Sequence, residues 1–127
     1  MLPVTTEWAA KAEGDFVTAL REYRARKQPN FDAACFPAQQ SAEKYIKALL
    51  QEQGVAFDKT HDLIRLSSLL STPLGLAALK SNLAELSAAA VEFRYPGETA
   101  TREVARASIA TCRAVRSEVR HQLGIPQ

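Results

Sequence analysis

Apolar residues recur along the chain at intervals of three and four, and no segment alternates between apolar and polar side chains over a useful length. Intervals of three and four follow one face of an α-helix, whereas strands alternate with period two. We therefore expect an all-α protein. Short connections between its helices predict an antiparallel up-and-down bundle of four long helices plus one short helix.

The first helix is expected to begin at a cap formed by Thr5 or Thr6 and to end before Pro29. Its apolar side consists of Trp8, Ala12, Phe16, Ala19, Leu20 and Tyr23.

Asn30 can cap a second helix, and Gly54 suits the position just after its end. Because Pro37 removes one backbone donor, this helix either kinks there or begins near that residue. Its buried side is predicted to contain Phe31, Cys35, Ala38, Ala42, Tyr45, Ile46, Leu49 and Leu50.

A short helix is expected from about Thr60 to just before Pro73. His61 stands at its start, where Thr60 or Asp62 can cap the first turn. Capping explains this Thr-His-Asp segment more simply than catalysis does.

The next helix is predicted to start with Pro73 in its first turn and Ser71 or Thr72 as its cap. Its regular apolar pattern predicts packing along its length against other helices at a shallow angle. The pattern consists of Leu76, Leu79, Leu83, Leu86, Ala90 and Phe93.

Thr99 or Thr101 can cap the last helix, which is expected to run to about Leu123 before Gly124 and Pro126 end the ordered chain. A helical wheel predicts one core face on it, formed by Val104, Ala105, Cys112, Val115, Val119 and Leu123.

With 127 residues, 46% of them hydrophobic, the chain fits one compact domain over residues 1–127. No apolar run approaches the roughly 20 residues of a membrane helix. The first residues lack a basic stretch followed by an apolar one, so we expect a cytoplasmic protein.

The cysteines, Cys35 and Cys112, fall on apolar helical stretches and are expected to be buried free thiols. Together with His61 and His121 they lack the spacing of metal ligands, so no metal site is expected. The glycines form neither a dinucleotide-binding nor a P-loop motif, and no cofactor is expected.

Positive charge is concentrated in the last helix: residues 94–127 carry a net charge of +3, and the first 93 residues carry −1. On the wheel, the arginines of this helix fall on one face beside the core. They form either a solvated face whose stems cover apolar edges or a ridge that contacts phosphates or a second subunit. This arginine stripe consists of Arg102, Arg106, Arg113, Arg116 and Arg120.

Arg116 and His121 have a spacing found in some metal-independent ribonucleases. A histidine can exchange the protons of such a reaction, and an arginine can stabilise the charge that develops on the phosphate. On a straight helix, however, the two positions diverge by about 140°. If the chain is a ribonuclease, they are its candidate catalytic pair.

Polar side chains also fall on predicted apolar faces. Gln39 lies in the middle of one, and Asp15 lies beneath Trp8 on another. A buried carboxylate needs a partner, which Gln39, Lys44 or Arg94 can supply. These residues form either a structural polar cluster or a pocket that faces a ligand.

One combination of motifs covers nearly the whole chain. It comprises Trp8, Ala12 and Asp15-Phe16, then Ala34-Cys35-Phe36, the Gln39–Lys44 block, Lys47–Leu50, His61-Asp62-Leu63, Arg94-Tyr95-Pro96 and the arginine-bearing last helix. In this order the residues resemble the HEPN domain family, a name that stands for higher eukaryotes and prokaryotes nucleotide-binding. The resemblance implies a helical bundle, usually a homodimer, often encoded beside a minimal nucleotidyltransferase.

The resemblance leaves three functions open. Some members bind nucleotides or RNA without catalysis, some are ribonuclease toxins neutralised by the partner, and a purely structural dimerisation module is the third. The toxins place an Arg-to-His motif near the start of the last long helix. Here Arg94 occupies that region, but no histidine follows it before His121, and Leu123 stands where one toxin branch has a tyrosine.

We expect a non-catalytic nucleotide- or RNA-binding protein whose ligand contacts come from Asp15, Gln39, Lys44, Arg94, Arg102, Arg106 and Arg113. The last helices are expected to form a homodimer interface, with Ile109 between the core face and the arginine stripe.

Overall fold

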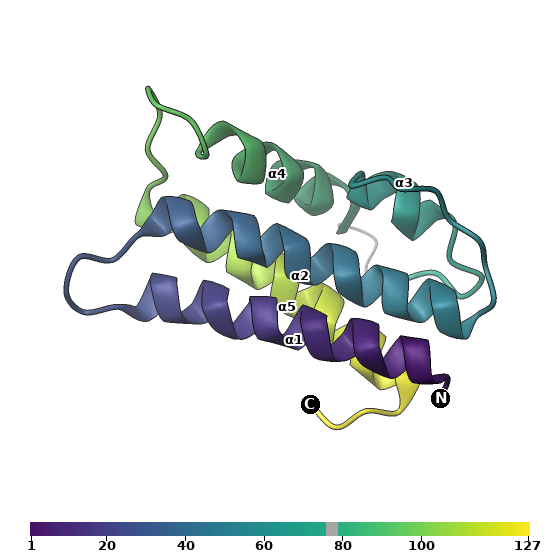
Figure 1. The fold of residues 1–127 in the computed structure, drawn as a ribbon. Coiled ribbons are helices and arrows are strands. Elements are labelled where there is room, and N and C mark those ends of the chain that lie inside the picture. The colour runs from purple at the N-terminus through teal and green to yellow at the C-terminus, as the bar shows by residue number, and fades with distance from the viewer. Residues whose placement is uncertain (76–78) are drawn as a thin grey trace.

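The computed structural model describes residues 1–75 and 79–127 and shows that part of the chain to be all-α, as predicted (Figure 1). Four long helices and one short helix appear in the expected order. They are α1 (Pro3–Arg24), α2 (Phe31–Glu52), α3 (Leu63–Ser68), α4 (Leu79–Glu92) and α5 (Arg102–Leu123).

Helix α2 is the centre of the bundle. The long helices run alternately up and down, with α1 and α5 along α2 and with α3 and α4 on the side of α2 away from α1 (Figure 1). Because α2 contacts each of the other four helices, it is buried around most of its circumference.

The predicted apolar faces form the core. Ala12, Phe16 and Ala19 are buried on α1, and Trp8, Leu20 and Tyr23 pack against them from its edge. On α2 every predicted position except the partly buried Phe31 is inaccessible or nearly so. The core face of α5 is equally confirmed, with Val104 and Leu123 at its margins.

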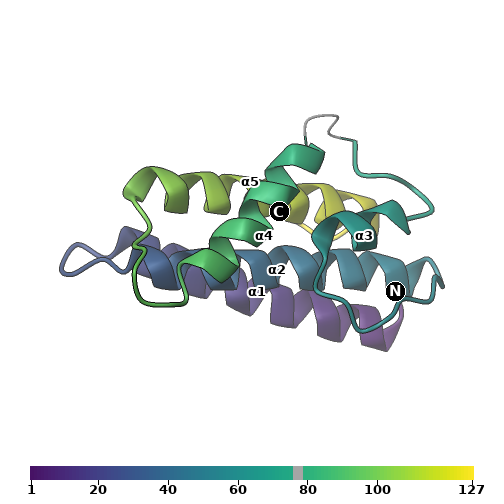
Figure 2. The ribbon, with the colours of Figure 1, turned by 90° about the horizontal axis from the view of Figure 1, so that it is seen from above.

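Helix α4 differs from its predicted start and direction. It begins at Leu79, whereas Pro73 lies outside any helix, and Leu76 lies outside the described residues. Figure 2 shows α4 crossing α2 and α5 obliquely, so the expected shallow angle is wrong. Since α4 contacts both neighbours, the groove between them sets its direction, and Leu83 and Leu86 are buried there.

Residues 71–75 are not helical and are fastened to two other helices. The Ser71 backbone N–H donates to Gln53 Oε1 at 2.7 Å, which attaches the segment to the end of α2. The Gly75 N–H donates to Glu118 Oε1 on α5 at 3.3 Å. These bonds hold the chain across the bundle, so the predicted cap at Ser71 or Thr72 is wrong.

Two of the other predicted caps are confirmed: the Asn30 side chain accepts from the Ala33 N–H, and Thr101 accepts from the Val104 N–H. The helix that follows Asn30 begins at Phe31 and continues through Pro37. Gly54 and Gly124 both have positive φ beyond their helix ends, as expected there.

The predicted cap at Thr5 or Thr6 is wrong because α1 starts earlier, with Pro3 in its first turn and Leu2 before it. Glu52 at the end of α2 fixes this start. Its Oε1 accepts the Leu2 N–H and the Thr5 hydroxyl, both at 2.9 Å.

The chain after Gly124 folds back instead of ending order there. The Ile125 N–H donates to the Arg120 carbonyl at 2.9 Å. Arg120 Nε donates to the Pro126 carbonyl and Arg116 Nη2 to the Gln127 carbonyl, both at 2.7 Å. The tail therefore lies against α5.

Both thiols are free and buried at the contact between α2 and α5, as predicted. Burial raises the pKa of Cys112 to about 12 and also raises that of Cys35. No helix in the described part of the chain is both long and apolar enough to cross a membrane.

A polar clamp joins three of the four long helices, α1, α2 and α5. Glu13 Oε1 and Oε2 accept from Arg116 Nε and Nη2 at 2.7 and 2.8 Å, and Glu13 Oε1 also accepts from the Tyr45 hydroxyl at 2.7 Å. Arg120 Nη1 donates to the same hydroxyl oxygen at 3.0 Å. The bidentate bond from Arg116 lowers the pKa of Glu13 from 4.5 to about 2.

We expect Glu13→Gln to lower the free energy of unfolding at pH 7 by about 1–2 kcal/mol, less than the full pKa difference implies, because the carboxylate is 32% exposed. The folded-state pKa lies below the unfolded one. The stabilisation is therefore complete above pH 4.5 and disappears as the pH falls toward 2. Urea denaturation across this pH range measures it. The control Glu7→Gln changes an exposed carboxylate of the same helix, and an equal loss in both variants would contradict the clamp.

Candidate functional site

A buried carboxylate on α2 organises the site. Glu43 is 3% exposed, and its Oε2 accepts from Lys47 Nζ, one helical turn later, at 3.0 Å. Lys47 is itself 7% exposed, and its ammonium group lies 5.5 Å from the centre of the Trp8 ring. Because both groups are buried from water, the ammonium group and the carboxylate compensate each other's charge. Removal of either would leave the other buried and unpaired.

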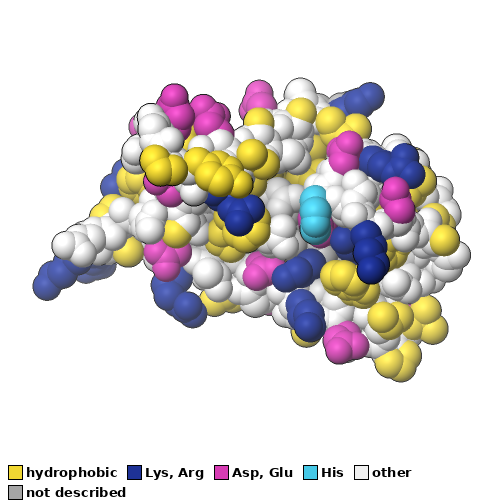
Figure 3. Space-filling model, turned by 45° about the horizontal axis from the view of Figure 1, so that its top comes forward, with side chains coloured by type: hydrophobic (Ala, Val, Ile, Leu, Met, Phe, Trp, Pro, Cys, Tyr) yellow, Lys and Arg dark blue, Asp and Glu magenta, His cyan; other side chains and the backbone are white. Residues whose placement is uncertain are grey.

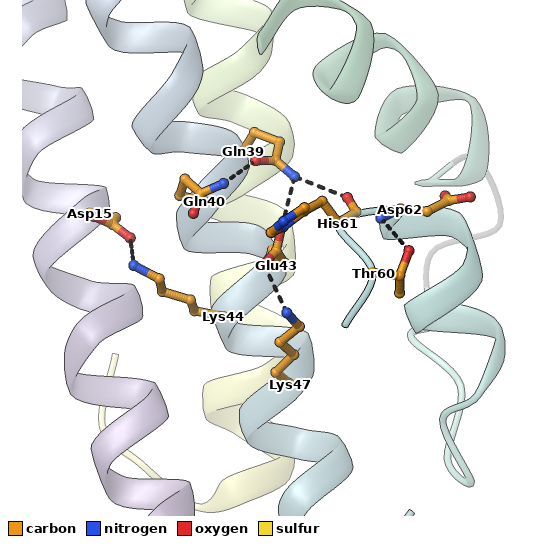
Figure 4. A network of polar contacts seen from close by, with 9 residues as sticks. All are labelled: Asp15, Gln39, Gln40, Glu43, Lys44, Lys47, Thr60, His61 and Asp62. Carbon is orange, nitrogen blue, oxygen red and sulfur yellow. Dashed lines mark hydrogen bonds and ion pairs between the residues drawn. The ribbon is translucent and has the colours of Figure 1, made fainter. Parts of the chain in front are cut away.

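The other oxygen of Glu43 holds His61, which precedes α3. His61 Nδ1 lies 2.9 Å from Glu43 Oε1. Because a carboxylate only accepts, Nδ1 carries the proton, and neutral His61 has its lone pair on Nε2. The imidazole is 77% exposed, so a ligand can reach it. Figure 4 shows Glu43 and His61 facing each other across the gap between α2 and the start of α3.

Gln39 completes the network. Its Nε2 donates to Glu43 Oε1 at 3.3 Å and to the His61 carbonyl at 3.2 Å, and its Oε1 accepts from Gln40 Nε2 at 2.8 Å (Figure 4). The amide of Gln39 is therefore hydrogen-bonded inside the fold. Its role is to hold the backbone at His61 against α2.

The predicted capping accounts for the side chains of Thr60 and Asp62 but not for that of His61. Asp62 accepts from the backbone N–H groups of Ile64 and Arg65, and so caps α3. Thr60 accepts from the Asp62 N–H. Neither contact involves the imidazole of His61, which bonds Glu43 instead.

A pocket of about 320 Å³ opens beside His61, between α2 and α4. Its polar wall contains Gln39, Gln40, His61 and Ser87, and its apolar wall contains Phe36, Ala90 and Val91. The cation at its rim is Arg94, whose guanidinium carbon lies 4.4 Å from the centre of the Phe36 ring. Figure 3 shows a histidine near the middle of this face with Lys and Arg side chains around it.

Asp15 and Lys44 lie elsewhere. Lys44 Nζ bonds Asp15 Oδ2 at 2.6 Å and joins α1 to α2 on a different side of α2 from the Glu43 network (Figure 4). Of the partners considered for Asp15, the structure selects Lys44 and not Gln39 or Arg94. The four residues therefore do not form one cluster: Gln39 and Arg94 share a pocket, and Asp15 and Lys44 form a separate ion pair.

The arginines of the stripe contact different partners. Arg113 and Arg116 lie over the Phe16 ring of α1, with guanidinium carbons 5.7 and 4.9 Å from its centre. Arg102 lies over Phe31 at 5.0 Å, and Arg106 Nε donates to the Tyr23 hydroxyl at 3.1 Å. Four guanidinium groups of the stripe thus contact aromatic side chains, while Arg102, Arg106 and Arg113 remain exposed.

The Arg116–His121 pair is not assembled as a catalytic centre. Arg116 is 12% exposed on its side chain, and Glu13 and the Gln127 carbonyl occupy its donors. His121 is exposed on α5. In the described structure the arginine faces α1 and the chain tail, and nothing directs it to His121.

Ile109 does not mark a subunit interface. It is 5% exposed and belongs to the core of one chain. The helical wheel placed it at an edge of the core face, whereas the fold buries it among the core residues of the bundle. The predicted position of Ile109 at the margin of the core face is therefore wrong.

Sequence reasoning missed Glu43, Lys47, Phe36 and His61 as parts of one site. A signal for the first two was present, because Gln39, Glu43 and Lys47 recur at intervals of four along one helical face. Their burial depends on Trp8, Phe57 and His61, which spacing along one helix does not place.

The site can bind an anion and orient a proton acceptor. Arg94 supplies a charge, Gln40 an amide, and His61 an imidazole held in one tautomer. Within the described residues, no group of three or more His, Cys, Asp and Glu side chains is arranged to hold a metal ion.

Comparison with known proteins agrees with this architecture. A search of curated proteins gave no match. The crystal structure of TT1696 from Thermus thermophilus superposes with a TM-score of 0.81 at 18% identity, covering 95% of this chain and 99% of that one. ST0689, described as an archaeal HEPN homologue, gives 0.76 at 26% identity, covering 94% and 97%. The model of the HEPN domain matches residues 5–122, so the chain belongs to the HEPN domain family.

Proposed function

We propose that this HEPN domain binds a nucleotide in the pocket between α2 and α4 without transforming it. The observation that carries the proposal is the convergence of Arg94, the Gln40 amide and the carboxylate-held His61 on one hollow with an apolar wall. The volume of about 320 Å³ is in the range of small-ligand sites.

The chemistry of the walls fits the parts of a nucleotide. Arg94 projects from the end of α4 over Phe36, and a guanidinium binds phosphate oxygens through paired N–H groups. Phe36, Ala90 and Val91 offer apolar surface to a base, and Gln40 offers an amide to its edge. A minimal nucleotidyltransferase is the proposed protein partner, on the strength of the family resemblance.

We expect ATP and AMP to bind more tightly than adenosine, because the phosphate is the part that Arg94 contacts. Arg94→Gln should weaken AMP binding by about tenfold or more, as a charge-assisted hydrogen bond contributes about 1.5–3 kcal/mol. Isothermal titration calorimetry measures this. The control Lys80→Gln removes an exposed charge of α4, away from the residues that line the pocket. Equal affinities for both variants, or no binding of any nucleotide at millimolar concentration, would refute the pocket.

The geometry argues against the ribonuclease alternative. We expect no metal-independent cleavage of single-stranded RNA by the wild-type protein, because Glu13 and the tail occupy Arg116. We also expect His121→Ala to leave the melting temperature unchanged, since His121 is exposed. Gel analysis of a labelled RNA and thermal melting test both. Cleavage that disappears in His121→Ala would restore the toxin interpretation.

We propose further that the domain forms a homodimer through α4 and α5. A groove of about 290 Å³ runs between these helices, with Leu86, Ala89, Phe93 and Ala107 among its lining residues. A second copy seated on this groove would cover apolar surface that one bundle leaves open.

Light scattering should therefore give about twice the mass of 13.9 kDa. Ala107→Glu places a charge in the groove and should produce monomers, whereas the control Ala10→Glu changes an exposed alanine on the outside of α1. A mass that stays at 13.9 kDa at high protein concentration would exclude the dimer.

A further inference from the structure

We propose that His61 is a modification site, whose Nε2 accepts a phosphoryl group from an acyl phosphate. The transfer takes place in the pocket between α2 and α4. It therefore shares that pocket with the proposed function, but it needs no nucleotide. Three features carry the inference: an exposed ring nitrogen, a buried carboxylate that holds the other side of the ring, and an arginine in the same pocket.

The imidazole of His61 turns one nitrogen toward the protein and leaves the other as a nucleophile. Nδ1 lies 2.9 Å from Glu43 Oε1 and carries the ring proton. The lone pair is therefore on Nε2, and a neutral imidazole nitrogen can attack an electrophile. A nucleophile must reach the phosphorus atom itself. The side chain of His61 is 77% exposed, which permits that approach.

The ring is held in place before any donor binds. Glu43 is 3% exposed and is fixed from its other oxygen by Lys47 Nζ at 3.0 Å. Gln39 Nε2 donates to Glu43 Oε1 at 3.3 Å and to the His61 carbonyl at 3.2 Å (Figure 4). Both the ring and the backbone of His61 are thus attached to α2. A group positioned in this way loses little freedom on reaction.

The charges around His61 suit a phosphorylated ring. Before transfer, the charges of Glu43 and Lys47 cancel and the imidazole is neutral. Once Nε2 bonds to phosphorus, the ring is a cation whose Nδ1 proton faces the Glu43 carboxylate. The new phosphoryl group carries about two negative charges. The ring compensates one of them, and Arg94 in the same pocket can compensate the other.

Arg94 also directs the attack to phosphorus. Its guanidinium carbon lies 4.4 Å from the centre of the Phe36 ring, and both side chains line the pocket of His61. A guanidinium binds phosphoryl oxygens through paired N–H groups. Such a contact stabilises the charge that develops on these oxygens during transfer. An acyl phosphate bound in this way presents phosphorus, and not its carbonyl carbon, to Nε2.

An acyl phosphate is the donor that these groups can serve. The bond between Nε2 and phosphorus forms as the bond between phosphorus and the acyl oxygen breaks. The electron pair of the broken bond goes to that oxygen, which leaves as part of a carboxylate. The Nδ1 proton stays in place, bonded to Glu43. Because a carboxylate leaves without taking up a proton, the step needs no acid in the pocket.

The chain contains its own control. His61 and His121 are its two histidines, and both are exposed. His121 lies on α5, away from the pocket, and among the described residues no carboxylate bonds its ring. If exposure alone decided reactivity, the two would react alike. The proposal requires that His61 react faster.

The test incubates the full chain with acetyl phosphate and locates the added mass by peptide mass spectrometry. Samples are kept alkaline, because phosphohistidine hydrolyses in acid. We expect a phosphoryl group on His61 at a rate about tenfold or more above that of His121. Phosphorus NMR should place it on Nε2. His61→Gln should abolish this label.

The role of Arg94 is tested by Arg94→Gln, which changes an exposed side chain and so preserves the fold. Labelling of His61 should slow by about tenfold, since charge-assisted hydrogen bonds to the phosphoryl oxygens are lost. The control Lys80→Gln removes an exposed charge of α4 away from the pocket and should label like the wild type.

Glu43 acts as a positioning residue, and its test removes both buried charges together. The double variant Glu43→Gln with Lys47→Met leaves no buried charge unpaired, and circular dichroism checks its fold. Labelling of His61 should fall to the rate of His121 and should no longer be restricted to Nε2. A label still confined to Nε2 at the wild-type rate would contradict the role of the carboxylate.

Four results would overturn the proposal. They are no phosphoryl group on His61, equal rates at His61 and His121, an acetyl group in place of the phosphoryl group on His61, and labelling by ATP but not by acetyl phosphate. The acetyl phosphate reactions contain no nucleotide, and the calorimetry with AMP contains no acyl phosphate. Failure of one experiment therefore leaves the result of the other intact.

Discussion

Enclosure of α2 by the other helices is the constraint on which the structure depends. A helix in that position has almost no face left for water, yet α2 carries a glutamate, a glutamine and a lysine among its buried residues. Burial of a charged group is tolerated only where a partner replaces its hydration. Glu43 therefore requires Lys47 on its own helix and His61 from the next segment, and these bonds hold the chain before α3 against α2.

The candidate site follows from this requirement. The network that satisfies a buried carboxylate also fixes the tautomer of an exposed imidazole beside a hollow. The same side chains stabilise the fold and position the pocket, since Gln39 bonds both the buried Glu43 and the carbonyl of His61. The site is thus built on a rigid helix, and its exposed groups His61 and Arg94 come from the segments before α3 and after α4.

The fold was largely predictable because apolar spacing records which face of each helix is covered. Ala12 and Phe16 on α1 and Val115 and Val119 on α5 lie where that spacing places them. Prediction failed where a distant partner decided the local structure. A hydrogen bond to Glu52 fixes the start of α1 at Pro3. Hydrogen bonds to Gln53 and Glu118 fix the non-helical chain around Pro73. Arg116 is a further case: the sequence shows its distance from His121 but not that Glu13 faces it.

The two buried cysteines make separation of α2 from α5 detectable by thiol alkylation. A thiolate is the form that reacts with alkylating reagents, and burial raises the pKa of both thiols, that of Cys112 to about 12. Both lie at the contact between α2 and α5, where Cys35 accepts from the Ser108 hydroxyl at 3.7 Å. Alkylation at neutral pH must therefore wait until these two helices separate. The rate of alkylation in native buffer therefore reports how readily α2 separates from α5.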